Sequence, residues 1–339
     1  MNLSERKKKI LSAVVDESLK TAEPVSSKDL QEKYIQDLSS ATIRNELMAL
    51  EEMGFLSQPH TSAGRIPTPE GYKKYINELM PIKKLSKKEA DSIKASFEEK
   101  FYSMDAILNK AAKTISDATN YASMVYYGIT DEAIVEKIGL IKLTDTQTLI
   151  IVATDLGLIK QETNSIQATE EELKGASKIL SNAFYGKTLR DIDNNSILLT
   201  KELTRYQDIF NLIIDIITSR EDDFDKNIAI SGKEKLLDYP EYHDIEKLKK
   251  TFSLLDKKEE LYPLLCSNNG DFEISFKIGG DEKLGITDCS IVTATYKSKG
   301  KPIGSAGVVG PVRMDYGKVV SILKNVIQVL EDDFFDKEK

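Results

Sequence analysis

The sequence predicts an α+β protein of several domains that opens with a winged helix-turn-helix. Three observations predict this class. The chain has 339 residues, and at roughly 150 residues per domain this length suits two or three domains. Its first 80 residues have the pattern of three short helices, a hairpin and a closing helix. The remainder mixes strand-like and helix-like segments, and 40% hydrophobic with 30% charged residues is typical of a soluble globular chain.

Capping residues mark the elements of this first region, because they supply the hydrogen bonds that helix ends lack. The predicted caps and stops are, in order, Ser4, Pro24, Ser26 with Asp29, Ser39 or Ser40, Gly54, and Thr68 with Pro69. Two short strands, Phe55–Pro59 and Arg65–Thr68, flank a small polar turn, His60–Gly64. Three helices, a hairpin and a fourth helix follow one another in the order of a winged helix-turn-helix.

A basic connector, Pro81–Lys88, comes next. Its lysines either add phosphate contacts or simply meet solvent; they are Lys83, Lys84, Lys87 and Lys88. Ser86 and Glu89 predict the start of a long helix, whose apolar residues from Phe97 to Val125 have heptad spacing. Two interpretations fit: a dimeric coiled coil, or a helix that packs on a sheet and is broken near Ser103. The small apolar residues from Ala111 onward favour the second.

The rest of the chain predicts a meander, helices and a second α+β region. The meander strands are Ile134–Leu143, Gln147–Ala153 and Leu158–Thr163. Thr169 and Glu172 cap a helix to about Phe184, and Lys201–Ser219 is so apolar that it must be buried in a core or against a second subunit. The later predicted elements are strands Ile228–Ser231, Phe272–Ile278, Ser290–Lys297 and Ile303–Val309, and helices Ile245–Leu265 and Met314–Phe335.

Charge and composition exclude several classes of protein. The net charge is −8, and the first 80 residues carry 11 basic and 12 acidic side chains, so any contact with nucleic acid must come from a local patch. The apolar runs are too short for a membrane span, and the N-terminus lacks the apolar core of a signal peptide. We therefore expect a cytoplasmic protein with no membrane partner.

Few residues are available for metal or redox chemistry. Cys266 and Cys289 are the only cysteines and His60 and His243 the only histidines, so neither a disulfide framework nor a metal site is expected. The phosphate-binding, metalloprotease and serine-hydrolase motifs are missing. The sequence therefore predicts no enzyme and no cofactor, and the cysteines are interpreted as small core residues.

The third helix has one apolar face and one face suited to DNA. Ile43, Leu47 and Leu50 share the face predicted to meet the core. The candidate contact residues on or beside the opposite face are Ser39, Ser40, Ala41, Thr42, Arg44, Asn45 and Met48. Arg44 suits guanine N7 and O6, Asn45 suits adenine N6 and N7, and the apolar side chains suit a thymine methyl group. The two serine hydroxyls and the helix N-terminus suit a phosphate.

Three glutamates lie further along this helix and are expected to point away from the DNA backbone: Glu46, Glu51 and Glu52. From this helix alone, a helix that reads DNA and a packing helix with a solvated face are equally good interpretations. The turn favours the first, because His60, Thr61, Ser62 and Arg65 offer four hydrogen-bonding side chains and no acid. Its small residues let the backbone approach a phosphate, and an arginine can reach a narrow minor groove. A solvated hairpin loop is the weaker alternative.

At these residues the chain closely resembles the HrcA family of bacterial heat-inducible transcription repressors. The matching segments are Ser39–Glu46, Leu50–Leu56, Pro59–Thr68, Gly71-Tyr72, Asp288–Ser290 and Gly310–Tyr316. The resemblance implies a homodimeric repressor of chaperone operons, which binds an inverted-repeat operator and is kept active by a GroEL-type chaperonin. Two-fold symmetry would match a palindromic operator and double the contacts of one helix.

The resemblance also implies a domain plan. Residues 1–80 would form the winged helix-turn-helix and 81–88 a linker. Residues 89–133 and 221–339 would form a discontinuous GAF-like domain, and 134–220 a dimerisation domain inserted into it, with the apolar helix 201–219 at the subunit interface. Because GAF-like domains often house ligands, a small-molecule sensor is the second hypothesis, with Gly279-Gly280 and Gly307–Gly310 as a candidate pocket lining. Glycines beside strands more often mark turns and bulges.

Overall fold

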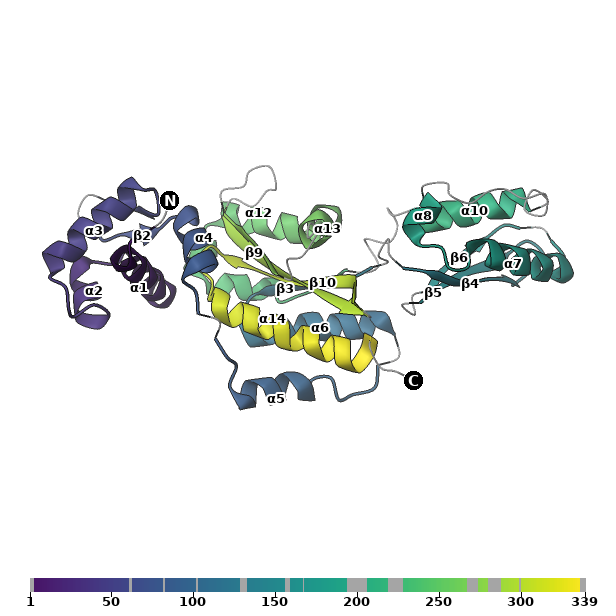
Figure 1. Ribbon diagram of the computed structural model, residues 1–339, viewed down its shortest axis with the longest axis horizontal. Helices are drawn as coiled ribbons and strands as arrows, with labels where there is room; N and C mark the ends of the chain where they lie inside the picture. Colours follow the sequence, from purple (N-terminus) through teal and green to yellow (C-terminus); the bar gives the residue numbers. More distant parts are fainter. Residues whose placement is uncertain are drawn as a thin grey trace. The chain divides into compact units, whose positions relative to one another are not determined.

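The protein is a mixed α/β chain with several sheets, seen in the computed structural model of Figure 1. The structure describes residues 3–60, 63–81, 83–101, 103–128, 133–155, 159–166, 168–193, 206–218, 228–266, 274–279, 288–298 and 300–335. The chain forms two compact units. The first is Met1–Tyr126 with Ala229–Thr295 and Ser305–Val329, and the second is Tyr127–Ile228 with Tyr296–Gly304 and Leu330–Lys339.

The N-terminal region of the first unit, residues 3–81, contains the elements predicted for it. They are α1 (Glu5–Thr21), α2 (Ser27–Lys33), α3 (Ser40–Glu52), β1 (Leu56–Ser57), β2 (Ile66–Pro67) and α4 (Pro69–Glu78). Ser4, Ser26 and Thr68 cap their helices as predicted. Of the two candidates for α3, Ser39 is the cap: its Oγ accepts the backbone N–H of Thr42 at 3.1 Å.

A small core and close backbone contacts hold this region together. The inward faces of the helices are fully covered, and they include Ile10, Leu11, Val14, Leu30, Ile43 and Leu50. Strands β1 and β2 pair antiparallel, Leu56 with Pro67 and Ser57 with Ile66. At Gly71 in α4, a Cβ atom would lie 2.0 Å from the carbonyl oxygen of Phe55. Only glycine allows α4 to approach the hairpin this closely.

The predicted long helix is two helices, α5 (Lys87–Ala95) and α6 (Met104–Thr119), and Ser103 caps the second. The break near Ser103 is therefore confirmed, and a continuous coiled coil is wrong. Asn120, at φ 61°, ends α6. Ala122 and Val125, expected to continue the helix, lie instead in β3 (Ala122–Tyr127), whose residues are all buried. The heptad spacing was coincidental there, since a strand buried on both faces carries apolar residues at most of its positions.

Strand β3 belongs to a five-stranded sheet with the order β7-β3-β10-β9-β8. The other strands are β7 (Ile228–Ser231), β8 (Ile274–Ile278), β9 (Cys289–Ser298) and β10 (Lys301–Pro311). Figure 1 shows α6 and α14 (Tyr316–Leu330) on one side of this sheet, with α12 (Ile245–Asp256) and α13 (Lys258–Cys266) on the other. All four of these strands and the final helix were predicted to within a few residues. Gly300, between β9 and β10, has the positive φ of 78° that a hairpin turn needs, and Lys299 lies outside the described residues.

The second unit contains the predicted meander. Strands β4 (Val135–Lys142), β5 (Thr148–Thr154) and β6 (Ile159–Asn164) pair antiparallel in that order. Helix α7 (Glu170–Phe184) starts at the predicted capping box of Thr169 and Glu172. A short helix, α8 (Leu189–Asp193), was not predicted. Of the predicted apolar helix, Gln207–Thr218 is helical (α10), while 201–205 and 219 lie outside the described residues.

Among the helices that the structure describes, none has the length and hydropathy that a membrane crossing requires.

Candidate nucleic-acid interface

Helix α3 separates its buried residues from its exposed ones as predicted. Ile43, Leu47 and Leu50 are at most 4% exposed and pack into the N-terminal region. The opposite side is open to solvent: Ala41, Arg44, Asn45 and Met48 are exposed, with Met48 at 46%, and Thr42 is half-buried. The apolar spacing fixes which face turns inward. The first half of α3 therefore presents an arginine, an asparagine, an alanine and a methionine to the outside.

The two serines that precede this face have partners within the protein. Ser39 Oγ caps the helix at the Thr42 N–H and lies 2.8 Å from Thr42 Oγ1. Ser40 Oγ lies 2.9 Å from Ser27 Oγ at the start of α2. Their first role is thus to fix the start of α3 and to connect it to α2. They lie at the helix N-terminus, where the helix dipole favours an anion.

Ion pairs neutralise several charges on and beside α3 but, among the described residues, leave Arg44 without a carboxylate partner. Glu46 pairs with Lys7 at 2.7 Å and with Arg6 at 3.5 Å, so α1 compensates the negative charge of this glutamate. Arg44 has no ion pair among the described residues. In water-exposed surroundings a guanidinium without a carboxylate partner keeps its full capacity for bidentate hydrogen bonds. Arg44 is thereby distinguished from the neighbouring cations.

A second acidic side chain of the N-terminal region, Glu17, is also neutralised by partners within the protein. Glu17, 7% exposed as a side chain, accepts from Lys33 Nζ and from Tyr34 OH at 2.8 Å. These two donors, Lys33 first, hold the pKa of the Glu17 carboxyl below its ordinary value. Lys20, in turn, donates to Tyr34 OH at 2.7 Å. This network fixes α2 against α1 and keeps a buried carboxylate satisfied.

The β1–β2 hairpin carries the other candidate residues. His60 is exposed, and its carbonyl accepts the N–H of Ala63 at 2.8 Å. Gln58 Nε2 donates to the carbonyl of Ala63 at 2.9 Å, which braces the turn from within. Thr61 and Ser62 lie outside the described residues. A Cβ on Gly64 would lie 2.3 Å from the Val25 carbonyl oxygen, so the hairpin runs directly against the segment between α1 and α2.

Arg65 lies elsewhere than the sequence suggested. Its Nε donates to Glu51 Oε2 at 2.8 Å, and its side chain is only 15% exposed. The composition of the turn predicts an Arg65 that reaches outward to DNA, and it gives Glu51 no partner. One sequence contains no signal for this contact, because the two residues are 14 positions apart and come from different elements. Arg65 joins the hairpin to α3.

At two glycines of the candidate ligand lining, side chains of the protein lie close to the backbone. A Cβ on Gly307 would lie 2.9 Å from Met124 Cε, and one on Gly310 would lie 2.8 Å from Met314 Sδ. These two glycines allow side chains to pack closely on the sheet, which argues against a pocket at these two positions. Gly280 lies outside the described residues. Cys289 is buried, and burial raises the pKa of its thiol to about 12, which suits a core residue and not a nucleophile.

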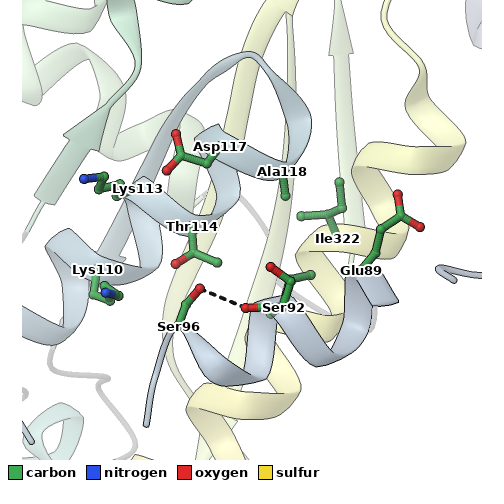
Figure 2. A pocket seen from close by; sticks show the side chains of 10 residues that line it. Glu89, Ser92, Ser96, Lys110, Lys113, Thr114, Asp117, Ala118 and Ile322 are labelled. Atoms are coloured by element: carbon green, nitrogen blue, oxygen red, sulfur yellow. Dashed lines mark hydrogen bonds between the residues drawn. The ribbon is translucent and has the colours of Figure 1, made fainter. Parts of the chain in front are cut away.

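A pocket of about 320 Å³ lies instead among α5, α6 and α14, and Figure 2 shows its mixed lining of hydroxyl, charged and apolar side chains. Several of the charges are already paired within the protein. Lys110 Nζ lies 2.6 Å from Glu99 Oε1, and Asp117 Oδ1 lies 2.7 Å from Lys235 Nζ. The lining carries both positive and negative side chains, and some of them are already paired. The pocket therefore favours neither anionic nor cationic ligands. Over the described residues, no group of three acidic, histidine or cysteine side chains is placed to hold a metal ion.

Comparisons with known proteins agree with one another. The family profile described as "HrcA protein C terminal domain" matches residues 105–320. The heat-inducible transcription repressor HrcA of Pelotomaculum thermopropionicum is 36% identical, over 98% of each chain. The protein of the same name from Symbiobacterium thermophilum is 33% identical over 97% of this chain and 98% of its own. That of Clostridioides difficile is 32% identical over 95% and 97%.

Among solved structures, a crystal structure described only as that of a hypothetical protein has the same fold, with a TM-score of 0.60 at 21% identity, over 98% of this chain and 99% of that one. The curated relatives are named as transcription repressors and not as enzymes. Similarity over nearly the full length, together with the matched profile, shows that this chain is a member of the HrcA family.

Proposed function

We propose that the protein is a homodimeric, sequence-specific DNA-binding repressor of heat-shock chaperone operons that acts in the cytoplasm. The observation that carries the proposal is the exposed pair Arg44 and Asn45, on the face of α3 opposite its buried residues. Arg44 lacks an ion-pair partner among the described residues, so its guanidinium is available to a guanine edge. Each subunit would insert residues 39–48 of α3 into a major groove and repress by occluding the promoter.

The proposed domain plan is the one that the family resemblance implies. Residues 1–80 form a winged helix-turn-helix, with the hairpin as wing, and 81–88 form a linker. Residues 89–133 and 221–339 form a GAF-like domain, and 134–220 form a dimerisation domain inserted into it. The order of helices and hairpin in the N-terminal region supports the first part. The separate three-stranded sheet, β4-β5-β6, supports the last part.

The hairpin contributes to the proposed DNA contact through its exposed turn. His60, with Thr61 and Ser62, would meet the flanking backbone or minor groove. In the linker, Lys83 contributes less, because its Nζ is paired with Asp315 Oδ2 at 2.6 Å. Surface charges that are neutralised within the protein add little to the binding of phosphates.

Dimerisation is proposed through α10. Within the chain Phe210 and Ile213 are buried, and Phe210 contacts Phe184 with ring centroids 5.4 Å apart. Ile209 and Leu212 stay only half-buried, which leaves apolar surface for a second copy. A dimer would place two α3 helices on an inverted repeat, and half-site spacing would then depend on the folded state of both subunits.

A GroEL-type chaperonin is proposed to control the fraction of competent dimer. This part rests on the family resemblance. A partly unfolded subunit loses the half-site spacing, so refolding by the chaperonin restores repression.

The test is a footprint of the purified full-length protein on the DNA upstream of chaperone genes, with and without the chaperonin. We expect a protected inverted repeat whose occupancy rises when chaperonin is present. Uniform protection at every sequence, or none at any, would contradict sequence-specific repression. Sedimentation of the same sample reports whether the bound species is a dimer.

A further inference from the structure

The hairpin and α3 are joined by one partly buried ion pair. Arg65 Nε and Glu51 Oε2 are 2.8 Å apart, and their side chains are 15% and 34% exposed. A charge-assisted hydrogen bond at this distance is among the stronger contacts a protein surface can form. Both residues lie in the part of the chain to which we assign DNA binding. A direct contact between either side chain and DNA would not explain why the two side chains pair with each other.

The backbone around Arg65 fixes the direction of its side chain. Arg65 and Val25 form an antiparallel bridge, in which the Val25 N–H donates to the Arg65 carbonyl at 2.9 Å and the Arg65 N–H donates to the Val25 carbonyl at 2.8 Å. Gly64 runs against Val25 without room for a Cβ. Two hydrogen bonds and this close approach hold the base of the hairpin, so Arg65 is held facing α3.

We propose that Arg65 and Glu51 are positioning residues that set the hairpin at a fixed angle to α3, and that Arg65 does not itself contact DNA. The inference rests on the proposed function and refines it, because it replaces a direct contact by an indirect one. Sites built from two elements need support of this kind, since a displacement of well under 1 Å already weakens contacts to bases and phosphates. Arg44 and His60 remain the outward-facing groups of the two elements.

The neighbouring glutamate provides a matched control. Glu52 follows Glu51 directly, is exposed, and has no ion pair among the described residues. Electrostatics alone predicts the same sign for both changes: removing a carboxylate near phosphates strengthens DNA binding. The positioning role predicts opposite signs, because Glu51→Gln loses the ion pair while Glu52→Gln loses only a charge.

The experiment measures the affinity of full-length protein for the DNA duplex it selects, for the wild type, Glu51→Gln and Glu52→Gln. We expect Glu51→Gln to bind about tenfold more weakly and Glu52→Gln to bind as well as the wild type or better. If Glu51→Gln binds as tightly as the wild type or more tightly, the proposal is overturned.

Arg65 variants separate position from contact. Arg65→Lys keeps a cation opposite Glu51 and should retain most of the affinity, whereas Arg65→Gln should bind more weakly with an unchanged salt slope. A direct phosphate contact would instead lower the slope of log K against log salt by about 1 in Arg65→Gln. Such a loss of slope would also overturn the proposal.

Amide hydrogen exchange in the hairpin gives a readout that does not depend on DNA. Exchange of residues 63–66 should become faster in Glu51→Gln than in Glu52→Gln, at equal melting temperature of the whole protein. If the wild type selects no duplex but this difference is present, the proposed function fails and the positioning contact stands. Equal exchange in both variants would remove the contact as well.

Discussion

Arg44→Ala is the substitution that tests most directly whether α3 reads DNA. The side chain is exposed and lacks an ion pair among the described residues, so its removal should change the free energy of unfolding by no more than about 0.5 kcal/mol. A bidentate contact to guanine contributes about 1–3 kcal/mol of discrimination. A dimer loses two such contacts, and the dissociation constant should therefore rise at least about 30-fold.

The assay is a gel-shift titration at fixed salt, on the selected duplex and on duplexes in which each base pair of a half-site is changed in turn. For the wild type, one guanine position should dominate the loss of affinity. In Arg44→Ala that position should become indifferent while the other positions keep their ranking. Relaxed preference at one position, and not a uniform loss, is the expected signature of a base contact.

Lys73→Ala is the matched control, because it removes a cation of the same region. Lys73 lies on α4, is paired with Glu70 at 2.9 Å, and its side chain is 45% exposed. It should leave the base preference intact. The assignment of α3 to the major groove is refuted if Arg44→Ala binds like the wild type, or if its affinity falls equally for every duplex.

Three further predictions concern stability. Because the pKa of Glu17 is lowered, the contribution of its carboxylate to folding stability is complete above the unfolded-state pKa of about 4.3 and is lost as the pH falls through the lower folded-state pKa. Thermal unfolding between pH 7 and pH 3 should therefore show a smaller loss of stability in acid for Glu17→Gln than for the wild type. Equal losses would contradict this role. Gly71→Ala should destabilise the protein by about 1–3 kcal/mol or more, because the new Cβ would lie 2.0 Å from the Phe55 carbonyl oxygen. Gly139→Ala should be tolerated, because its Cβ would lie 3.6 Å from Ile151 Cβ. Denaturant titration measures the stability of both variants, and equal midpoints would show that α4 shifts freely. Tyr316→Phe removes the hydroxyl that bonds Ser290 at 3.0 Å and the Val312 carbonyl, and should cost about 1–3 kcal/mol in the same titration because it leaves buried acceptors unsatisfied; an unchanged midpoint would mean that water replaces the phenol.

The local elements of this protein were predictable because their signals are local. Caps such as Ser4, Ser26 and Thr169 act within one helical turn, and each lies where the sequence placed it. The choice between Ser39 and Ser40 could not be made from the sequence, since both hydroxyls suit a cap. It depends on Ser27, which takes Ser40 as its partner across 13 residues.

The errors arose where distant residues decide the outcome. Ala122 and Val125 continued a helical period by chance, and only the sheet, through β7 and β10 on either side, makes that segment a strand. Arg65 was expected outside because arginine on a tight turn usually is; its partner Glu51 is brought near by the packing of the hairpin on α3. The apolar face of α3 was predictable from spacing, whereas the pairing of charges on its other side was not.

The place of β3 in its sheet affects how the chain is synthesised. Both neighbours of β3 come later in the sequence, and β10 begins only at Lys301, near the end of the chain. An emerging polypeptide therefore holds this mostly apolar strand with one edge open until β7 has been made and the other edge open until β10 has been made. During that interval the strand is open to pairing with other chains, so yield in the cell should depend on how quickly ribosomes reach the end of β10.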